Sequence, residues 1–326
     1  MDPTTVGHLE HRMGRTSVSF KFHFRLGGYG PPTTSFSQSL KFIGDRLEAE
    51  FGDDVEVRYI WNIMDLGYRG EDILWLVEHG FLTVAYQSTS YLTDRVPELG
   101  FVDLPFLFQN NKSARSSMDG ALGNYLSRKT EEQINYRVLG YFENGFRHIS
   151  NRLRPIHIPD DLKNMRIRVL PSDVQAKTFK LLGANPQRLD LTEAIEGVKS
   201  GTLDAQENPF ANTVTYDVHK FHPYHTKSNH FYISRGIFAN RIAFYSWPEK
   251  MKKIMEETVT EAIVFQRNLA ENEAIDSQNI IEAEGHKVVE LTETEHLAFV
   301  QAVASQHEEA RSQFGNTMFD MISKEF

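Results

Sequence analysis

Four arginines in two short segments have the chemistry to bind an anion. GFRHISNR supplies Arg147 and Arg152, and MRIRV supplies Arg166 and Arg168. A guanidinium presents a planar fork of donors that matches a carboxylate in two hydrogen bonds. Because side chains two residues apart in a strand share a face, Arg166 and Arg168 are predicted to point the same way.

The two strand arginines have different expected environments. Arg166 begins its strand, so we expect it to be exposed to solvent. Arg168 lies in mid-strand and ends near the predicted helix start at Ser172, where free N–H groups and partial positive charge favour an anion. A buried guanidinium needs a partner. From the residues alone, that partner is equally a ligand or a carboxylate of this chain.

Two further segments are rich in polar side chains. In DAQENP, Gln206 and Asn208 share one strand face and Glu207 takes the other. Carboxamides donate and accept, which suits a polar ligand, although a polar strand end at the surface explains them as well. HKFHPYHTKSNH carries the histidines His219, His222, His225 and His230. Pro223 breaks helical spacing and no HExxH motif is present, so a polar connecting segment is favoured over a metal site.

Composition excludes several classes of function. The 326 residues are 40% hydrophobic and 24% charged, with a net charge of -9 and no cysteine. Disulfides and a thiol nucleophile are therefore excluded, and the acidic balance argues against nonspecific nucleic-acid binding. No GxSxG or phosphate-binding glycine motif occurs. No apolar run is long enough to span a membrane, and no signal-peptide pattern precedes residue 18, which leaves the compartment open.

The order of predicted elements indicates two α/β units. Strands at 20–26, 54–61 and 82–88 alternate with helices at 35–52 and 71–80. The same β-α-β-α-β order recurs over 165–210, with caps at Ser172 or Asp173 and at Thr192. One very long helix is predicted over 247–285 and an amphipathic helix over 292–315. Two lobes with a cleft between them are the simplest account.

Several segments together resemble one family. The sequence resembles the substrate-binding proteins of TRAP transporters, the DctP-like family, over residues 20–320. The resemblance rests on VPELGFVDLPFLF (96–108), GFRHISNR (145–152), LKNMRIRVLPS (162–172), LLGANPQRLDLTEAIEGVKSGTLDAQENP (181–209) and SWPEKMKKIMEE (246–257), which occur in the family's order and spacing.

The resemblance implies an α/β fold of the two-lobed, class II periplasmic-binding-protein type. Each lobe is expected to hold a mainly parallel sheet flanked by helices, and the long helix is expected to span both lobes. We expect lobe I at 18–144 plus 234–275 and lobe II at 145–233 plus 276–326. Residues 1–17 are expected to form a flexible tail. The crossovers between the lobes are expected near 144–146 and 232–236.

The resemblance also implies a function. Such proteins capture a small organic acid in the periplasm, such as a dicarboxylate, a sugar acid or another hydroxy or oxo acid, and close over it. They deliver it to the membrane subunits of a secondary transporter. We therefore expect a monomer without catalytic activity, cofactor, metal, nucleic-acid partner or direct membrane insertion. A cytosolic ligand-sensing module and an enzyme on the same scaffold stay open as alternatives.

Site residues follow from the resemblance position by position. Arg168 is implied to form a salt bridge with the ligand carboxylate, and Arg147 and Asn208 to contact the same ligand. Glu207 is implied to orient neighbouring polar groups or water. Lesser expected contacts are Ser88 and Thr89 in the wall of lobe I, His230 and Tyr232 near the hinge, and Arg25 at the end of the first strand. Pro171 stands where some members have asparagine, so side-group selectivity is expected to differ.

Overall fold

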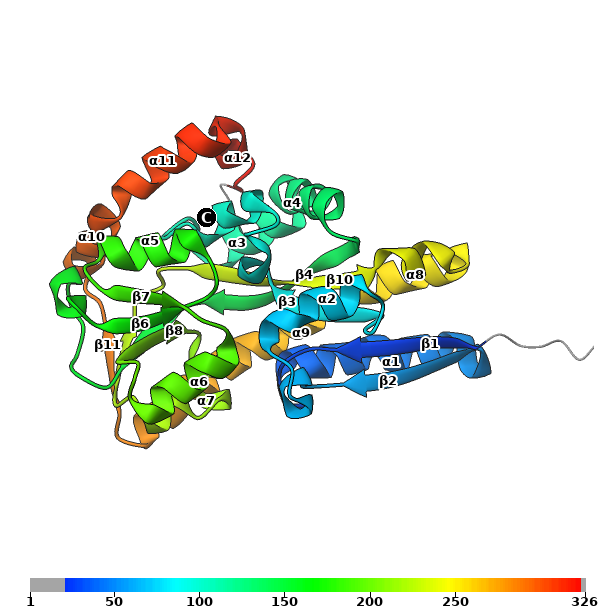
Figure 1. The fold of residues 1–326 in the computed structure, drawn as a ribbon, viewed down its shortest axis with the longest axis horizontal. Helices are drawn as coiled ribbons and strands as arrows, with labels where there is room; N and C mark the ends of the chain where they lie inside the picture. The colour runs from blue at the N-terminus through cyan, green and yellow to red at the C-terminus, as the bar shows by residue number, and fades with distance from the viewer. Residues whose placement is uncertain (1–20, 324–326) are drawn as a thin grey trace, which may run out of the picture.

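The computed structural model describes residues 21–323, which form two α/β lobes side by side (Figure 1). The tail predicted at 1–17 lies outside the described residues. The strands are β1 (Phe22–Gly27), β2 (Val55–Ile60), β3 (Val84–Ser88), β4 (Tyr136–Phe146), β5 (His148–Asn151), β6 (Arg166–Val169), β7 (Asn185–Arg188), β8 (Ala205–Asn208), β9 (Tyr224–Lys227), β10 (Tyr232–Asn240) and β11 (Lys287–Glu290). The helices are α1 (Ser35–Phe51), α2 (Ile73–Glu78), α3 (Asn111–Asp119), α4 (Ala121–Gln133), α5 (Asp173–Leu181), α6 (Leu191–Ser200), α7 (Phe210–Thr215), α8 (Arg241–Ser246), α9 (Glu249–Ala283), α10 (Glu293–Ala302), α11 (Ala304–Phe314) and α12 (Asn316–Asp320).

Lobe I is built on a sheet with the strand order β2-β1-β3-β10-β4. β1 runs parallel to β2 and β3, as the β-α-β pattern predicts, whereas β10 runs antiparallel between β3 and β4. Helix α1 begins after Thr34, whose side chain accepts from the Ser37 N–H. It buries Leu40, Ile43 and Leu47 against the sheet, because these residues recur at helical spacing.

Lobe II is built on a sheet with the strand order β11-β9-β5-β8-β6-β7. β6 lies between β7 and β8 and is parallel to both, so its middle is covered on each side. Arg168 on β6 pairs in register with Gln206 and Gln187. The N-cap of α5 is Ser172, as predicted, but α6 is capped by Asp190 and not by Thr192, because the helix begins one residue before Thr192.

The two lobes meet where the chain crosses between the sheets. β4 ends at Phe146 and β5 begins at His148, so Arg147 alone separates the two sheets at the first crossover. The second crossover lies between β9 and β10, at residues 228–231. The predicted position of 232–236 is too late, since Tyr232 already pairs with Phe146 in lobe I. The Arg147 N–H donates to the Phe231 carbonyl at 2.9 Å, which ties the two crossovers together.

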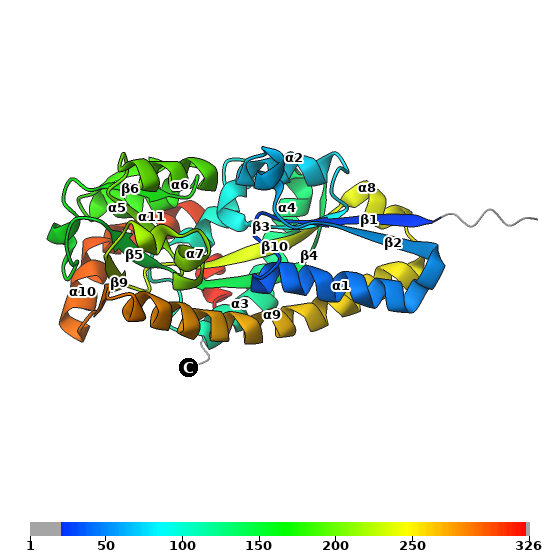
Figure 2. The same ribbon diagram turned by 90° about the horizontal axis from the view of Figure 1, so that it is seen from below.

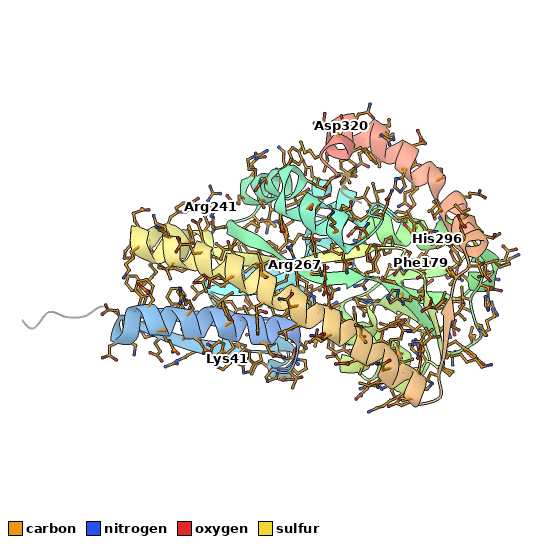
Figure 3. All side chains as sticks on the ribbon, turned by 180° about the vertical axis from the view of Figure 1, so that it is seen from behind. Lys41, Phe179, Arg241, Arg267, His296 and Asp320 are labelled. Carbon is orange, nitrogen blue, oxygen red and sulfur yellow. The ribbon has the colours of Figure 1, made fainter. Side chains whose placement is uncertain are left out.

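Helix α9 connects the lobes along one side of the molecule. It is 35 residues long and runs beneath both lobes (Figure 2). Met251, Met255 and Val259 near its start join the core of lobe I, and its far end leads into β11 of lobe II. Arg267, near the middle, pairs with Asp119 at 2.6 Å (Figure 3). The prediction of one uninterrupted helix spanning both lobes is confirmed.

The C-terminal segment differs from the single helix expected at 292–315. It forms α10 and α11, which are separated at Val303, and then α12. Phe299 and Val303 pack into the core of lobe II, whereas Ala310 and Met318 pack into the core of lobe I. The segment therefore contacts both lobes, and the predicted lobe boundaries stay a prediction. Within residues 21–323, no helix combines the length and apolar character needed to cross a membrane.

Candidate functional site

A small polar cavity lies between the lobes beside the crossovers. Its volume is about 20 Å³. Three arginines contribute to it, one from each lobe and one from the first crossover. The lining residues are Tyr29, Ser88, Tyr91, Asn144, Arg147, Arg168, Leu170, Leu191, Asn208, Asn212 and Arg235.

Arg168 enters this cavity from the middle of β6 and is 1% exposed. Its Nε donates to the Leu189 carbonyl at 2.9 Å, and its Nη2 lies 3.5 Å from the Tyr91 hydroxyl. Within residues 21–323 no carboxylate lies within 4.0 Å of the guanidinium, so its charge has no ion-pair partner there. The buried positive charge is thus held by neutral groups only.

The helix N-terminus expected beside Arg168 can be compared with the N-termini of α5 and α6. Leu191, the first residue of α6, lines the cavity and its N–H donates to the Tyr91 hydroxyl at 3.2 Å. Ser172, the cap of α5, opens instead into a different hollow on the outer surface. The helix that reaches the cavity is therefore α6 and not α5, because β6 ends before α5 turns outward.

Arg147 lies at the first crossover and is also 1% exposed, but it has a partner within the chain. Its Nη2 donates to Oε1 of Glu207 at 2.8 Å and to the Glu207 carbonyl at 2.7 Å, while its Nε donates to Oε2. Burial raises the pKa of Glu207, but the charge of Arg147 and bonds from His230 and Arg147 outweigh it and hold that pKa below its usual range. The pair is ionised and held in one orientation.

His230 packs against this ion pair and does not line the cavity. Its Nε2 lies 3.4 Å from Oε2 of Glu207, and its Nδ1 lies 2.7 Å from the Ser228 hydroxyl. Burial lowers the pKa of His230, so the ring is neutral at physiological pH. His230 therefore supports Glu207, which in turn orients Arg147, the role that the resemblance implied for Glu207.

A chain of amides crosses the floor of the cavity. The Asn208 side chain donates to Gln206 at 3.2 Å and accepts from Asn212 at 3.1 Å. Asn212 also donates to the Asn144 side chain at 3.2 Å. These amides come from β8, α7 and β4, so they link both lobes. Asn208 lies where the sequence predicted, whereas Asn144 and Asn212 were not expected, because nothing local in the sequence brings β4 to α7.

Arg235 is the main site residue that sequence reasoning missed. It lies in the middle of β10, 3% exposed, and faces the cavity from lobe I. A signal was available, because an arginine between the buried residues Ile233 and Ile237 of a strand needs a partner for the same reason as Arg168. The resemblance drew attention to the neighbouring His230 and Tyr232 instead.

The remaining predicted contacts are divided between the cavity and other places. Ser88 lines the cavity, and no group in the described residues bonds its hydroxyl. Thr89 donates to the Ser234 carbonyl at 3.4 Å, and Tyr232 donates to Glu143 at 2.8 Å. Arg25 is exposed and bonds the carbonyls of the α2–β3 loop at Gly80 and Phe81. The structure thus does not bring Thr89, Tyr232 or Arg25 to the cavity.

Contacts across the mouth of the cavity show that the lobes are closed. Arg69 of lobe I pairs with Glu193 on α6 at 2.8 Å, and Asp94 pairs with Arg188 at 3.1 Å. The Asp190 carboxylate also accepts from the Glu71 N–H at 2.9 Å. A cavity of about 20 Å³ has room for roughly one water molecule. A larger molecule therefore requires the lobes to separate or the lining to shift.

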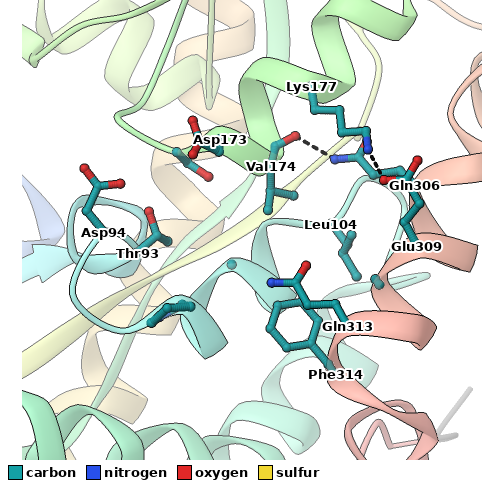
Figure 4. A pocket seen from close by; sticks show the side chains of 14 residues that line it. Thr93, Asp94, Leu104, Asp173, Val174, Lys177, Gln306, Glu309, Gln313 and Phe314 are labelled. Atoms are coloured by element: carbon teal, nitrogen blue, oxygen red, sulfur yellow. Dashed lines mark hydrogen bonds and ion pairs between the residues drawn. The ribbon is translucent and has the colours of Figure 1, made fainter.

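A larger hollow on the outer surface has different chemistry. It measures about 510 Å³ and lies between α5, α11 and the loop before Leu104 (Figure 4). Its charges all have partners at the surface, since Lys177 pairs with Glu309 and both Asp94 and Asp173 pair with Arg188. The Gln306 amide donates to the Val174 carbonyl at 2.7 Å (Figure 4). None of these groups is a buried charge without a partner. The interlobe cavity is therefore the better candidate site.

Comparison with known proteins agrees with this fold. Residues 27–313 match the family model DctP, described as bacterial extracellular solute-binding protein, family 7. The chain belongs to this family. The members to which it is compared below are solute-binding proteins.

Individual relatives are distant but cover most of the chain. The 2,3-diketo-L-gulonate-binding periplasmic protein YiaO of Escherichia coli is 28% identical over 231 residues, which is 71% of this chain and 69% of YiaO. The sugar acid binding protein DctPAm of Advenella mimigardefordensis, solved with galactonate, is 25% identical with a TM-score of 0.88, covering 93% of this chain and 98% of that one. A TRAP periplasmic solute-binding protein of Sulfurospirillum deleyianum, solved with succinate, is 25% identical with a TM-score of 0.86 and the same coverage.

Proposed function

We propose that this chain is the extracytoplasmic binding component of a TRAP-type transporter and captures a small organic acid between its lobes. A ligand carboxylate pairs with Arg168, and Arg147 and Asn208 donate further hydrogen bonds. The protein then delivers the acid to membrane subunits. It acts as a monomer in the periplasm and catalyses no reaction.

One observation carries the proposal, namely the buried guanidinium of Arg168. Leaving a buried charge without a counter-ion is costly, so an anion from outside the chain would relieve the cost. The absence of an ion-pair partner for Arg168 within residues 21–323 leaves this position to a ligand. The relatives solved with galactonate and with succinate support an organic acid as that ligand.

Closure follows from the same charge. In the closed form Arg168 has lost most of its water, whereas in an open form water solvates it. A bound carboxylate therefore stabilises the closed form more than the open one, and ligand binding shifts the population towards closure. Contacts such as Arg69 with Glu193 hold the closed lobes together at the surface.

A thermal-shift screen with a panel of sugar acids, dicarboxylates and oxo acids tests the proposal. A ligand present at about 100 times its Kd adds about 2.7 kcal/mol to the free energy of unfolding, which is easily detected. We expect at least one acid to raise the Tm, its neutral amide to have no effect, and the acid to be recovered unchanged after incubation. Turnover of the acid would favour the alternative of an enzyme, and the absence of any shift would overturn the proposal.

A further inference from the structure

Arg235 is a second buried cation that faces the same cavity from the opposite lobe. It lies in mid-strand on β10, between Ser88 on β3 and Phe142 on β4. β10 is interior to its sheet, and Arg235 is only 3% exposed. Arg235 and Arg168 therefore line one cavity from lobe I and lobe II.

The surroundings of Arg235 contain aromatic rings and no counter-ion. Its guanidinium lies 4.0 Å from the centre of the Phe36 ring, 4.7 Å from that of Tyr29 and 5.5 Å from that of Tyr86. Ring faces attract a cation but leave its charge uncancelled. The Nε of Arg235 is buried, and no group in the described residues accepts its hydrogen bond.

An acidic side chain that interacts with Arg235 is engaged elsewhere. The Glu273 carboxylate interacts electrostatically with Arg235, but it accepts from the Ser35 N–H at 2.6 Å, at the start of α1. Within residues 21–323 no carboxylate lies within 4.0 Å of Arg235. Arg235 is thus held in position by packing and by its interaction with the Tyr216 hydroxyl, while its Nε has no acceptor among the described residues.

The charges around the cavity can be compared directly. Glu207 neutralises Arg147, so the charge of that arginine is cancelled within the chain. Arg168 and Arg235 are not neutralised and carry two positive charges around a cavity of about 20 Å³. Like charges repel more strongly in the low-dielectric interior of a protein than in water. A ligand with one negative charge would cancel one of them and leave the other uncompensated in the closed form.

We propose that Arg235 binds a second anionic group of the ligand, so that the site selects organic acids with a carboxylate at each end over acids with one. This inference rests on the proposed function and specifies the class of acid. One carboxylate pairs with Arg168 of lobe II and the other with Arg235 of lobe I. The ligand then forms an ionic bridge between the lobes, and each end contributes to closure.

Matched pairs of acids provide the test. Galactarate and galactonate share one carbon skeleton and differ in one terminal group, a carboxylate in the first and a hydroxymethyl in the second. Succinate and succinamate differ by a carboxylate and a neutral amide. Isothermal titration of the unmodified chain should give about 10- to 100-fold tighter binding of the dianion in at least one pair, the difference expected for a charged hydrogen bond.

Variants separate the two arginines. Arg235→Met keeps much of the side-chain volume, and it should lower the affinity for the dianion to that for its single-charge partner while the affinity for that partner changes little. Arg235→Lys, which keeps the charge, should retain part of the preference. Arg168→Met should weaken both members of a pair. Near-ultraviolet circular dichroism of each variant without ligand identifies any that fails to fold, and the preference of the unmodified chain does not depend on the variants.

The two proposals fail in different ways. Tight binding of galactonate or succinamate with no preference for the dianion would overturn the inference and leave the proposed function intact. If Arg235→Met weakened binding of the dianion and of its single-charge partner equally, the inference would also be overturned and the proposed function would stand. Failure of the unmodified chain to bind any member of either pair, together with a negative acid screen, would overturn the proposed function and the inference with it.

Discussion

Glu207 accepts hydrogen bonds from Arg147 with both oxygens of its carboxylate and with its own main-chain carbonyl. Both side chains are buried, with exposed fractions of 2% and 0%. Because the three bonds use Nε and Nη2, they fix the plane of the guanidinium at the point where β4 passes into β5. The pair thereby determines how the first crossover presents Arg147 to the cavity.

Breaking this pair should destabilise the folded chain. Glu207→Gln leaves Arg147 as an uncompensated buried charge, and such a loss costs about 3–5 kcal/mol of the free energy of unfolding. Urea denaturation measures the change. Glu56→Gln is a suitable control, because Glu56 pairs with the exposed Arg58 and its loss should change stability much less. A loss for Glu207→Gln no larger than that of the control would contradict the structural role of the pair.

Arg168→Gln should weaken ligand binding without destabilising the folded chain. We expect the affinity for the acid identified by the screen to fall more than about 10-fold, since a charged hydrogen bond is lost. The free energy of unfolding without ligand should stay the same or rise, because an uncompensated buried charge is removed. Titration calorimetry and urea denaturation measure the two effects.

Arg166 provides the matched control for this experiment. It lies on the same strand, but it pairs with Asp204 at 2.7 Å, and its side chain is 41% exposed. The hydrogen bond from Arg166 is the main reason that the pKa of Asp204 lies well below its usual range. Burial alone would raise that pKa. Arg166→Gln should keep the affinity for the acid. Unchanged binding by Arg168→Gln would show that the assignment of the anion partner is mistaken.

The contacts at the mouth of the cavity should affect the dissociation rate. Arg69→Ala removes the pair with Glu193, and an exposed pair contributes about 0.2–1 kcal/mol. We expect dissociation of the ligand to become about two- to five-fold faster, with a smaller difference at high salt. Stopped-flow fluorescence measures the rate. Arg58 pairs with Glu56 within lobe I, so Arg58→Ala should leave the dissociation rate unchanged. An equal effect of both variants would argue that the Arg69–Glu193 pair does not hold the lobes closed.

Buried histidines in lobe II should make stability depend on pH. His219, His222, His225 and His230 are all buried, which differs from the polar connecting segment expected. Burial lowers the pKa of His222 to about 3 and that of His225 to about 4. An unfolded histidine takes up a proton near pH 6.5, so between about pH 6.5 and pH 4 the unfolded chain binds protons that the folded chain does not. Stability should therefore fall as the pH decreases through this range.

Urea denaturation at pH 7.5, 6 and 5 measures this dependence. His222 and His225 should each contribute up to about 1.4 kcal/mol per pH unit below the unfolded pKa. Replacing His225 by Gln should reduce the slope of stability against pH, because it removes a group that takes up a proton more readily in the unfolded chain than in the folded one. His79→Gln, at an exposed position, should keep the slope of the unmodified chain. A stability that is independent of pH over this range would refute the explanation.

Local patterns predicted the elements well, because caps and periodicity act over a few residues. Ser172, one of the two expected caps, caps α5 at the start of an amphipathic segment. The break at Val303 was missed, because the apolar pattern continues through it while the two halves pack on different lobes. Tertiary contacts thus overrode the local signal.

The site was predictable only in part. The resemblance identified Arg168, Arg147 and Asn208, and all three line one cavity. The contribution of Arg235 depends on β10 inserting between β3 and β4, and no local pattern specifies that strand order. The pairing of Arg147 with Glu207 likewise depends on β5 lying beside β8. Such long-range neighbours follow from topology and not from spacing along the chain.

The position of Arg147 between the two sheets has a kinetic consequence. A point on a rotation axis does not move when two bodies turn about it, and Arg147 is joined by a main-chain bond to the second crossover at Phe231. An acid held at Arg147 would keep that contact at every degree of opening, whereas Arg168 and Arg235 are carried on the turning bodies. Uptake would then proceed by capture at the stationary pivot followed by enclosure from both sides.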